Sequence, residues 1–242
     1  FALFNANSVF SKSCTLPFAM SNSSANLRAV CCKSRCFSLD VARTSIKFGE
    51  RSWTYGDVAQ RAQSLGQRLL EAGLSPQQRV YIILPDSPTF AWSFFGALKA
   101  GGIVAMGNPI TATDTLLDVI DYVQPHTAIS TASVMERLVE ANPSVASLHT
   151  LTVPDVTTMD DPETAIDRSD CMHTILAHQE SGYPWPTTNK DTPSIWLFTS
   201  GSTGTPKAAM HCHGDFHFNT EVYAKGTIGY QRDDVCVSVP RL

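Results

Sequence analysis

The chain has 242 residues, 43% of them hydrophobic, which is enough for one large or two small globular domains. No apolar run approaches the ~20 residues that a membrane-spanning helix requires, so the sequence predicts no membrane span. The charge is uneven: residues 1–39 hold four basic and no acidic side chains, whereas the remainder holds 14 basic and 22 acidic side chains, a net charge of −8. A body this acidic argues against nucleic acid as a partner.

Residues 1–39 are basic, rich in Ser, Asn and Ala, and show no sustained helical or strand period. This composition is typical of a disordered leader or of an organelle transit peptide. Mistranslated or non-native upstream sequence is a third interpretation. The chain does not begin with Met, so we expect the sequence to be incomplete at its front. A transit peptide would imply a mitochondrial or plastid location, and a cytoplasmic location is expected otherwise. Because the leader has no periodic apolar face, we expect it to be dispensable for folding.

The chain contains seven cysteines, an odd number, and this usage favours a reducing compartment. Cys31, Cys32 and Cys36 lie close together in the leader, as metal ligands often do. No second pair of ligands follows at a matching spacing, so the sequence does not favour a metal site there.

From Asp40 onward, short strand patterns alternate with helical patterns. The predicted elements are a hairpin of strands 44–48 and 51–55, strands 80–84, 103–106, 127–130, 148–153, 208–210 and 235–239, and helices over 54–73, 87–98, 111–123, 134–139 and 213–224. Thr54-x-x-Asp57 and Thr111-x-x-Asp114 have the spacing of capping boxes and predict where two of the helices begin. Residues 80–84 form a nearly all-apolar run that ends at Pro85, which is typical of a strand buried on both faces.

Strands and helices that alternate at this pace indicate βα units. The predicted fold is therefore α/β, with a mostly parallel sheet and helices on both faces. The pattern weakens over residues 154–193, which are rich in acidic residues and proline. We interpret that stretch as a mobile connection within the 40–242 unit.

One loop carries the clearest chemical signal in the chain. It runs from Phe198 to Lys207 with the sequence F-T-S-G-S-T-G-T-P-K, directly after the apolar run 195–197. Gly201 and Gly204 permit positive φ and let backbone N–H groups approach a ligand. The surrounding hydroxyl groups add donors and Lys207 adds a positive charge, so a polyphosphate is the expected ligand.

The spacing differs from that of a Walker A loop, because Pro206 precedes the lysine and Ala208 follows it. The order S-G-S-T-G-x-P-K instead resembles the phosphate loop of the adenylate-forming (AMP-binding, acyl-CoA synthetase) superfamily. Ala208 departs from that pattern, since the family usually has glycine after the lysine. A surface turn is the alternative, but flexible linkers seldom follow Ile-Trp-Leu-Phe or end in Pro-Lys.

Further stretches between residues 40 and 242 also resemble this superfamily. They are Trp53-Thr54-Tyr55, Ala97 to Gly102 with Val104 and Asn108-Pro109, Ile195 to Phe198, His211-x-His213, Glu221-x-Tyr223 and Asp233 to Cys236. Those around the loop look most like benzoate-type aryl-CoA ligases. The resemblance implies the N-terminal portion of an AMP-binding domain, incomplete relative to the whole adenylate-forming fold.

The resemblance implies an ATP-dependent acid–thiol ligase that forms an acyl-adenylate and then an acyl-CoA thioester. ATP, Mg²⁺ and CoA are the implied cofactor and co-substrates, and an aromatic carboxylate is the implied acid. The residues implied to bind the ATP phosphates are Thr199, Ser200, Gly201, Ser202, Thr203, Gly204, Thr205 and Lys207. Lys207 is also the implied catalytic residue, and His211 is expected near the nucleotide or acyl site.

Two further functions stay open at this point. The chain resembles adenylation domains that load an acyl group onto a carrier protein, and a non-catalytic truncated product or interaction module is a third possibility. In the family, the adenine-binding, Mg²⁺-binding and C-terminal lysine segments come after the part that matches here, so the chain alone is expected to be inactive. His211, His213 and His217 also suggest zinc, but a strand-to-helix junction would direct them differently, so no metal ligand is predicted.

Overall fold

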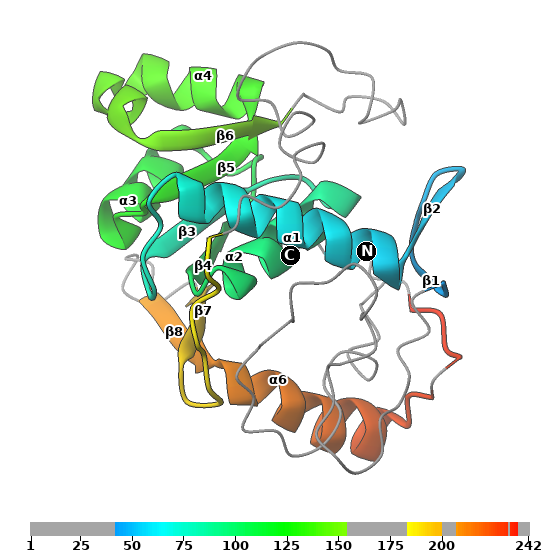
Figure 1. Cartoon of the computed structure of the whole chain (residues 1–242). Coiled ribbons are helices and arrows are strands. Elements are labelled where there is room, and N and C mark those ends of the chain that lie inside the picture. Colours follow the sequence, from blue (N-terminus) through cyan, green and yellow to red (C-terminus); the bar gives the residue numbers. More distant parts are fainter. Residues whose placement is uncertain (1–41, 154–182, 200–206, 232, 237–242) are drawn as a thin grey trace.

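The structure is a computed structural model that describes residues 42–153, 183–199, 207–231 and 233–236 (Figure 1). Its main sheet contains β3 (Arg79–Ile83), β4 (Ile103–Gly107), β5 (Thr127–Thr131), β6 (His149–Val153), β7 (Pro193–Thr199) and β8 (Lys207–Cys212). The strand order is β6–β5–β3–β4–β7–β8, and every neighbouring pair is parallel except β7–β8, which is antiparallel. The predicted α/β fold with a mostly parallel sheet is therefore confirmed.

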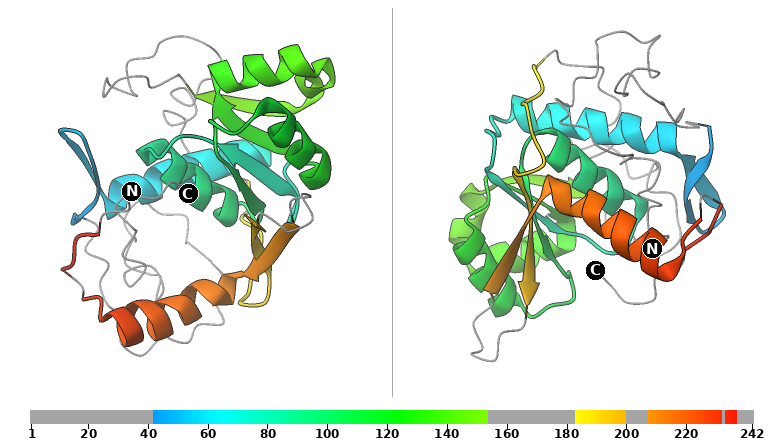
Figure 2. Two further views of the ribbon diagram at one scale, coloured as in Figure 1. Left: turned by 180° about the vertical axis from the view of Figure 1, so that it is seen from behind. Right: turned by 90° about the horizontal axis from the view of Figure 1, so that it is seen from below.

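Helices cover both faces of this sheet (Figure 2). One face packs against α1 (Tyr55–Glu71) and α2 (Pro88–Lys99), and the other against α3 (Thr113–Val123) and α4 (Ala132–Ala141). Successive residues of a strand point to opposite faces, so Val80 and Ile82 join the first core while Tyr81 and Ile83 join the second. This arrangement explains why residues 80–84 are apolar at consecutive positions.

A small hairpin precedes the main sheet. Strands β1 (Thr44–Phe48) and β2 (Arg51–Thr54) pair in antiparallel fashion, as the sequence predicted. The Trp53 ring meets the Trp92 ring edge-on, with 6.0 Å between their centroids. This aromatic contact fixes the hairpin to the α1–α2 pair.

The predicted start of α1 is also confirmed. The Asp57 backbone N–H donates to Thr54 Oγ1 at 3.1 Å, and the Thr54 backbone N–H donates to Asp57 Oδ2 at 2.8 Å. These bonds satisfy two amide donors at the helix terminus. The Thr54 backbone N–H and, to a smaller extent, the Thr54 hydroxyl donate to Asp57 Oδ2 and so lower the pKa of the Asp57 carboxyl. The helix stops near Gly73, whose φ of +89° lies in the left-handed region that glycine adopts readily.

Three expectations differ from the structure or lie partly outside the described residues. The predicted cap at Thr111 is wrong: the N-cap of α3 is Ala112, and its side chain makes no capping bond. Thr111 is instead held in the preceding turn, where its N–H donates to the Asn108 carbonyl. The helix predicted over 213–224 forms as α6 (His213–Asn219) and a π-helical continuation η3 (Thr220–Ile228). In the predicted strand 235–239, Val235 and Cys236 are not in a strand, and the remaining residues lie outside the described part.

The remaining element is a short 3₁₀ turn, η2 (Pro143–Ser147), between α4 and β6. None of the helices in the described part of the chain combines the length and the apolar character needed to cross a bilayer. Residues 1–41, which include the predicted leader, and residues 154–182 of the predicted connection lie outside the described residues.

Candidate active site

The two flanks of the predicted phosphate loop lie side by side at one edge of the main sheet. β4 and β7 are parallel, so the carboxyl end of β7 lies at the same edge as those of β3, β4, β5 and β6. Thr199 ends β7 and pairs across the strands with Lys207, which begins β8. Ligands of open α/β sheets bind at this edge, outside the carboxyl ends of the strands. The intervening predicted residues, Ser200 to Thr205, lie outside the described part of the chain.

Aromatic packing holds β7 against the second core. The rings of Trp196 and Phe198 each approach the Tyr122 ring of α3, with centroid distances of 6.2 and 6.1 Å. Ile195 points to the opposite face and is 6% exposed. Leu197, on the same face as Ile195 but nearer the carboxyl end, is 39% exposed, so β7 is packed on both faces only in its first half.

Lys207 and His211 occupy the same face of β8, since they are separated by four residues in a strand. Lys207 is exposed and sits next to the loop. His211 lies at the other end of the strand, where its Nδ1 is 3.1 Å from Asp215 Oδ2. The structure therefore places these two predicted residues on one face but at opposite ends of β8.

Asp215 is a polar residue at this site that the sequence analysis missed. Its Oδ2 accepts the Cys212 backbone N–H at 3.0 Å as well as contacting His211. The sequence does contain a trace of this bond, because Asp215 lies three positions after Cys212, which is the spacing of a capping box. Cysteine is not a usual N-cap residue, so the spacing did not indicate a helix start. An Nδ1–H donated to Asp215 would leave Nε2 of His211 as a hydrogen-bond acceptor.

The histidines after β8 do not converge. His213 packs its ring on Phe216, with 6.5 Å between ring centroids, and burial lowers the pKa of its imidazole. Its buried Nε2 has no hydrogen-bond partner among the described residues. No group of three or more His, Cys, Asp or Glu side chains suited to a metal ion occurs among the residues that the structure describes.

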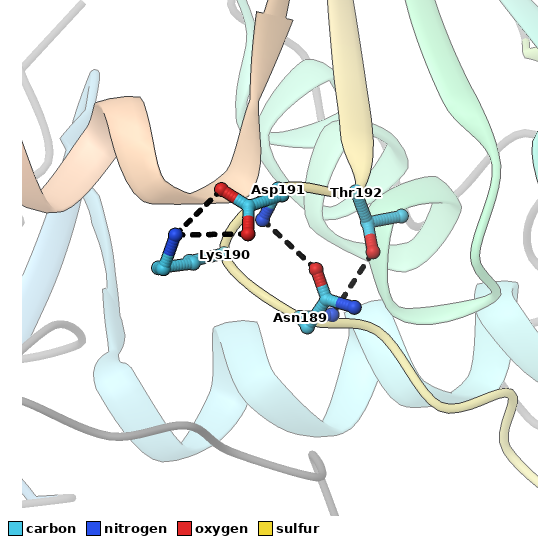
Figure 3. A network of polar contacts seen from close by, with 4 residues as sticks. All are labelled: Asn189, Lys190, Asp191 and Thr192. Carbon is cyan, nitrogen blue, oxygen red and sulfur yellow. Dashed lines mark hydrogen bonds and ion pairs between the residues drawn. The ribbon is translucent and has the colours of Figure 1, made fainter.

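A compact turn joins the starts of β7 and α6 (Figure 3). Asn189 Oδ1 accepts the Asp191 N–H at 2.9 Å, and the Asn189 N–H donates to Thr192 Oγ1 at 3.0 Å. The carbonyls of Lys190 and Thr192 accept the first two backbone N–H groups of α6, those of Gly214 at 2.7 Å and His213 at 3.0 Å. The turn therefore fixes where β7 begins and where the chain passes from β8 into α6.

The segment before this turn lies across α1 and α2. Gln67 Nε2 donates to the Tyr183 carbonyl at 3.2 Å, and Lys99 Nζ lies 4.2 Å from the centroid of the Trp185 ring. The Trp185 ring rests on Gly66, where an added Cβ would come within 2.9 Å of it. We call residues 183–186 the strap, because they run over both helices before the turn that leads into β7.

Comparison with known proteins gives the following relationships. The sequence profile of the family described as AMP-binding enzyme matches residues 38–242. The chain is 29% identical over 194 residues to benzoate–CoA ligase of Thauera aromatica, covering 79% of this chain and 34% of that protein. It is 25% identical over 186 residues to a linear gramicidin synthase of Brevibacillus parabrevis, covering 75% of this chain and 2% of that protein.

The fold has also been seen in solved structures. A benzoate CoA ligase from Burkholderia xenovorans LB400 superposes with a TM-score of 0.65 at 19% identity, over 80% of this chain and 36% of that one. At this identity the likeness concerns the fold alone. The chain spans about a third of the length of the two benzoate ligases that it matches.

Proposed function

The chain belongs to the AMP-binding enzyme family, and on that premise we propose that it supplies the ATP-phosphate-binding part of an acid–thiol ligase, within a longer protein. In the proposed first step, a carboxylate oxygen attacks the α-phosphorus of ATP, the acyl–phosphate bond forms, and pyrophosphate leaves. In the second step, the sulfur of CoA attacks the acyl carbon and AMP leaves. The relatives of this chain include both a benzoate–CoA ligase and a linear gramicidin synthase.

The observation that carries the proposal is the position of the β7–β8 connection. Thr199 and Lys207 face each other at the carboxyl edge of the sheet, so the residues between them must begin and end there. Those residues have the S-G-S-T-G-x-P composition that suits a polyphosphate. This edge is also where open α/β sheets hold their ligands.

In this proposal the residues from Thr199 to Thr205 donate backbone and hydroxyl hydrogen bonds to the β- and γ-phosphates. Negative charge accumulates on these groups as pyrophosphate departs. The ammonium of Lys207 therefore stabilises the transition state more than it stabilises bound ATP. His211 would lie beside the acyl or nucleotide site, with Asp215 orienting its ring. Mg²⁺ would accompany the nucleotide and share the charge of its phosphates, although the described residues contain no group of three or more His, Cys, Asp or Glu side chains suited to hold it.

An aromatic acid is the proposed substrate class, on the basis of the relationship to benzoate–CoA ligase. The relationship to linear gramicidin synthase supports a second candidate, an adenylation domain that passes its acyl group to a carrier protein. The two differ only in the thiol that accepts the acyl group. Supplying the longer protein with acyl-adenylate and either CoA or a carrier-protein thiol would distinguish them. The isolated 242-residue chain is proposed to form no acyl-CoA, and a non-catalytic role would leave the longer protein without activity too.

The test of the proposed function is Lys207→Ala in the longer protein. Losing one charged donor to the transition state costs about 2–4 kcal/mol, or roughly 10²–10³ in the rate of adenylate formation. Thioester formation from added acyl-adenylate should be nearly unchanged, because no polyphosphate takes part in that step. ATP–pyrophosphate exchange and single-turnover thioester formation measure the two steps separately.

Lys190→Ala is the matched control, because Lys190 is exposed and bonds to Asp191 in the turn rather than lying at the loop. It should leave both steps unchanged. If Lys207→Ala slows both steps equally, or slows neither, the loop does not bind the departing phosphates in the proposed way.

A further inference from the structure

A second cluster of polar side chains lies at the amino ends of the parallel strands, opposite the edge that holds the proposed nucleotide loop. Thr127 begins β5, and its register partner in β6 is His149. The Thr127 hydroxyl oxygen lies 2.9 Å from Nδ1 of His126 and 3.1 Å from Nδ1 of His149. The two imidazole rings therefore converge on one hydroxyl group, with 6.2 Å between their centroids.

These two contacts fix the positions of the protons in the neutral cluster. A hydroxyl group carries one proton, so Thr127 donates to one Nδ1 and accepts a hydrogen bond from the other. One imidazole is then protonated at Nδ1 and the other at Nε2. Because Thr127 is 0% exposed, solvent does not replace either imidazole as a partner of its hydroxyl.

Protonation therefore affects the two imidazoles differently. The imidazole that donates from Nδ1 can take a second proton at Nε2 without losing its bond to Thr127. The other imidazole can take its second proton only at Nδ1, and this leaves the buried hydroxyl proton without its acceptor. The doubly protonated cluster also places two cationic rings next to each other, which repel.

The backbone around His126 is held by β3 and by the end of α3. The His126 N–H donates to the Arg79 carbonyl at 2.8 Å, and the Arg79 guanidinium donates to the carbonyls of Val123 and Gln124, each at 2.8 Å. Burial lowers the pKa of the His126 imidazole below its ordinary value of 6.5. The charged side chains on the neighbouring elements are Arg79 of β3, Arg68 and Glu71 at the end of α1, Asp114, Asp118 and Asp121 of α3, and Glu136, Arg137 and Glu140 of α4.

We propose that His126, Thr127 and His149 form a proton-sensitive lock between β5 and β6, which is closed while one imidazole keeps an unprotonated Nδ1 and opens when both are protonated. The lock is independent of the proposed enzymatic function. It stabilises the start of β6 above pH 6.5, and this contribution is lost as the pH falls through the lowered pKa of His126. Loss of one hydrogen bond should make opening of the β5–β6 pairing at this end about fivefold to tenfold more frequent.

The first test is the tautomer of each histidine in the unsubstituted 242-residue chain. Long-range proton–nitrogen correlation spectra at about pH 8 distinguish Nδ1–H from Nε2–H imidazoles. We expect His126 and His149 to be opposite tautomers. Separate samples with His126→Gln and His149→Gln assign the two signals by their disappearance. The same tautomer for both imidazoles would overturn the proposal, because one hydroxyl proton could not then serve both contacts.

The second test is native-state hydrogen exchange, corrected for the intrinsic pH dependence of amide exchange. Between about pH 7.5 and about pH 5, the amides at the start of β6 should lose about fivefold to tenfold of their protection relative to those of β3 and β4. Thr127→Ser retains a hydroxyl and should retain this dependence. Thr127→Val removes the hydroxyl and should show the lower protection at both pH values.

His217→Gln is the matched control, because it removes a histidine of α6 that lies outside the lock. It should behave like the unsubstituted chain at both pH values. A pH dependence that survives Thr127→Val, or that is missing from the unsubstituted chain, would also overturn the proposal.

Discussion

Removing the Trp185 side chain tests whether the strap holds β7 in place. A fully buried Trp replaced by Ala costs about 3–5 kcal/mol. Trp185 is only partly buried, so we expect roughly half of that cost, and loss of the contact with Lys99 adds about 0.5–1 kcal/mol. Trp185→Ala should therefore lower the free energy of unfolding by about 2–3.5 kcal/mol. Urea denaturation followed by far-ultraviolet circular dichroism measures this quantity.

Two variants separate the contributions of the ring. Trp185→Phe retains an aromatic ring over Gly66 and should cost about 1 kcal/mol or less. Lys99→Met keeps an apolar side chain over Trp185 but removes the ammonium group. The Lys99 Nζ also donates to Gln63 Oε1 at 2.9 Å, and this bond is lost as well. Its cost should stay near about 1 kcal/mol. If Trp185→Ala is no more harmful than Trp185→Phe, the strap does not stabilise the sheet.

Two further predictions concern the helices that carry the strap. A Cβ added at Gly96 would come within 2.7 Å of the Ala62 carbonyl oxygen. Gly96→Ala should therefore destabilise the chain by about 1–2 kcal/mol, even after the gain in helix propensity. An unchanged urea midpoint would contradict the close contact between the two helices. The lowered pKa of Asp57 stabilises the fold above its ordinary value of 3.8, and this contribution is lost as the pH falls through the lowered value. Thr54→Val removes the bond that the Asp57 carboxylate receives from the hydroxyl but keeps the larger contribution of the Thr54 backbone N–H, so the pH dependence of unfolding below about pH 4 should flatten in part. An unaltered profile would show that the hydroxyl does not lower the pKa of Asp57.

Much of the fold could be predicted because its elements are marked locally. Buried parallel strands such as residues 80–84 are apolar throughout, and Thr54 and Asp57 mark a helix start through their own hydrogen bonds. The strand order could not be predicted in the same way, because β4 pairs with β7 across a long sequence separation. The cap at Thr111 was predicted wrongly because the turn at Asn108 uses the backbone N–H of that residue.

The candidate site was only partly readable from the sequence. The loop composition identified Thr199 and Lys207, and the structure places both at the carboxyl edge, while their roles stay a proposal. Asp215 was missed because its partners are a cysteine N–H and a histidine, neither of which marks a helix cap. Trp185 was missed because the strap has no periodic pattern and its position depends on contacts with α1 and α2.

The position of β7 between β4 and β8 has a consequence for the order in which the chain folds. β3, β4, β5 and β6 come from residues 79–153 and pair with neighbours that are close in the sequence, so their loops close early. β7 begins only at Pro193, and it must find β4 after a much longer loop has closed. During synthesis on the ribosome, the first four strands can therefore assemble before β7 has emerged. β7 and β8, which hold the two ends of the proposed nucleotide loop, are then the last strands of the sheet to form.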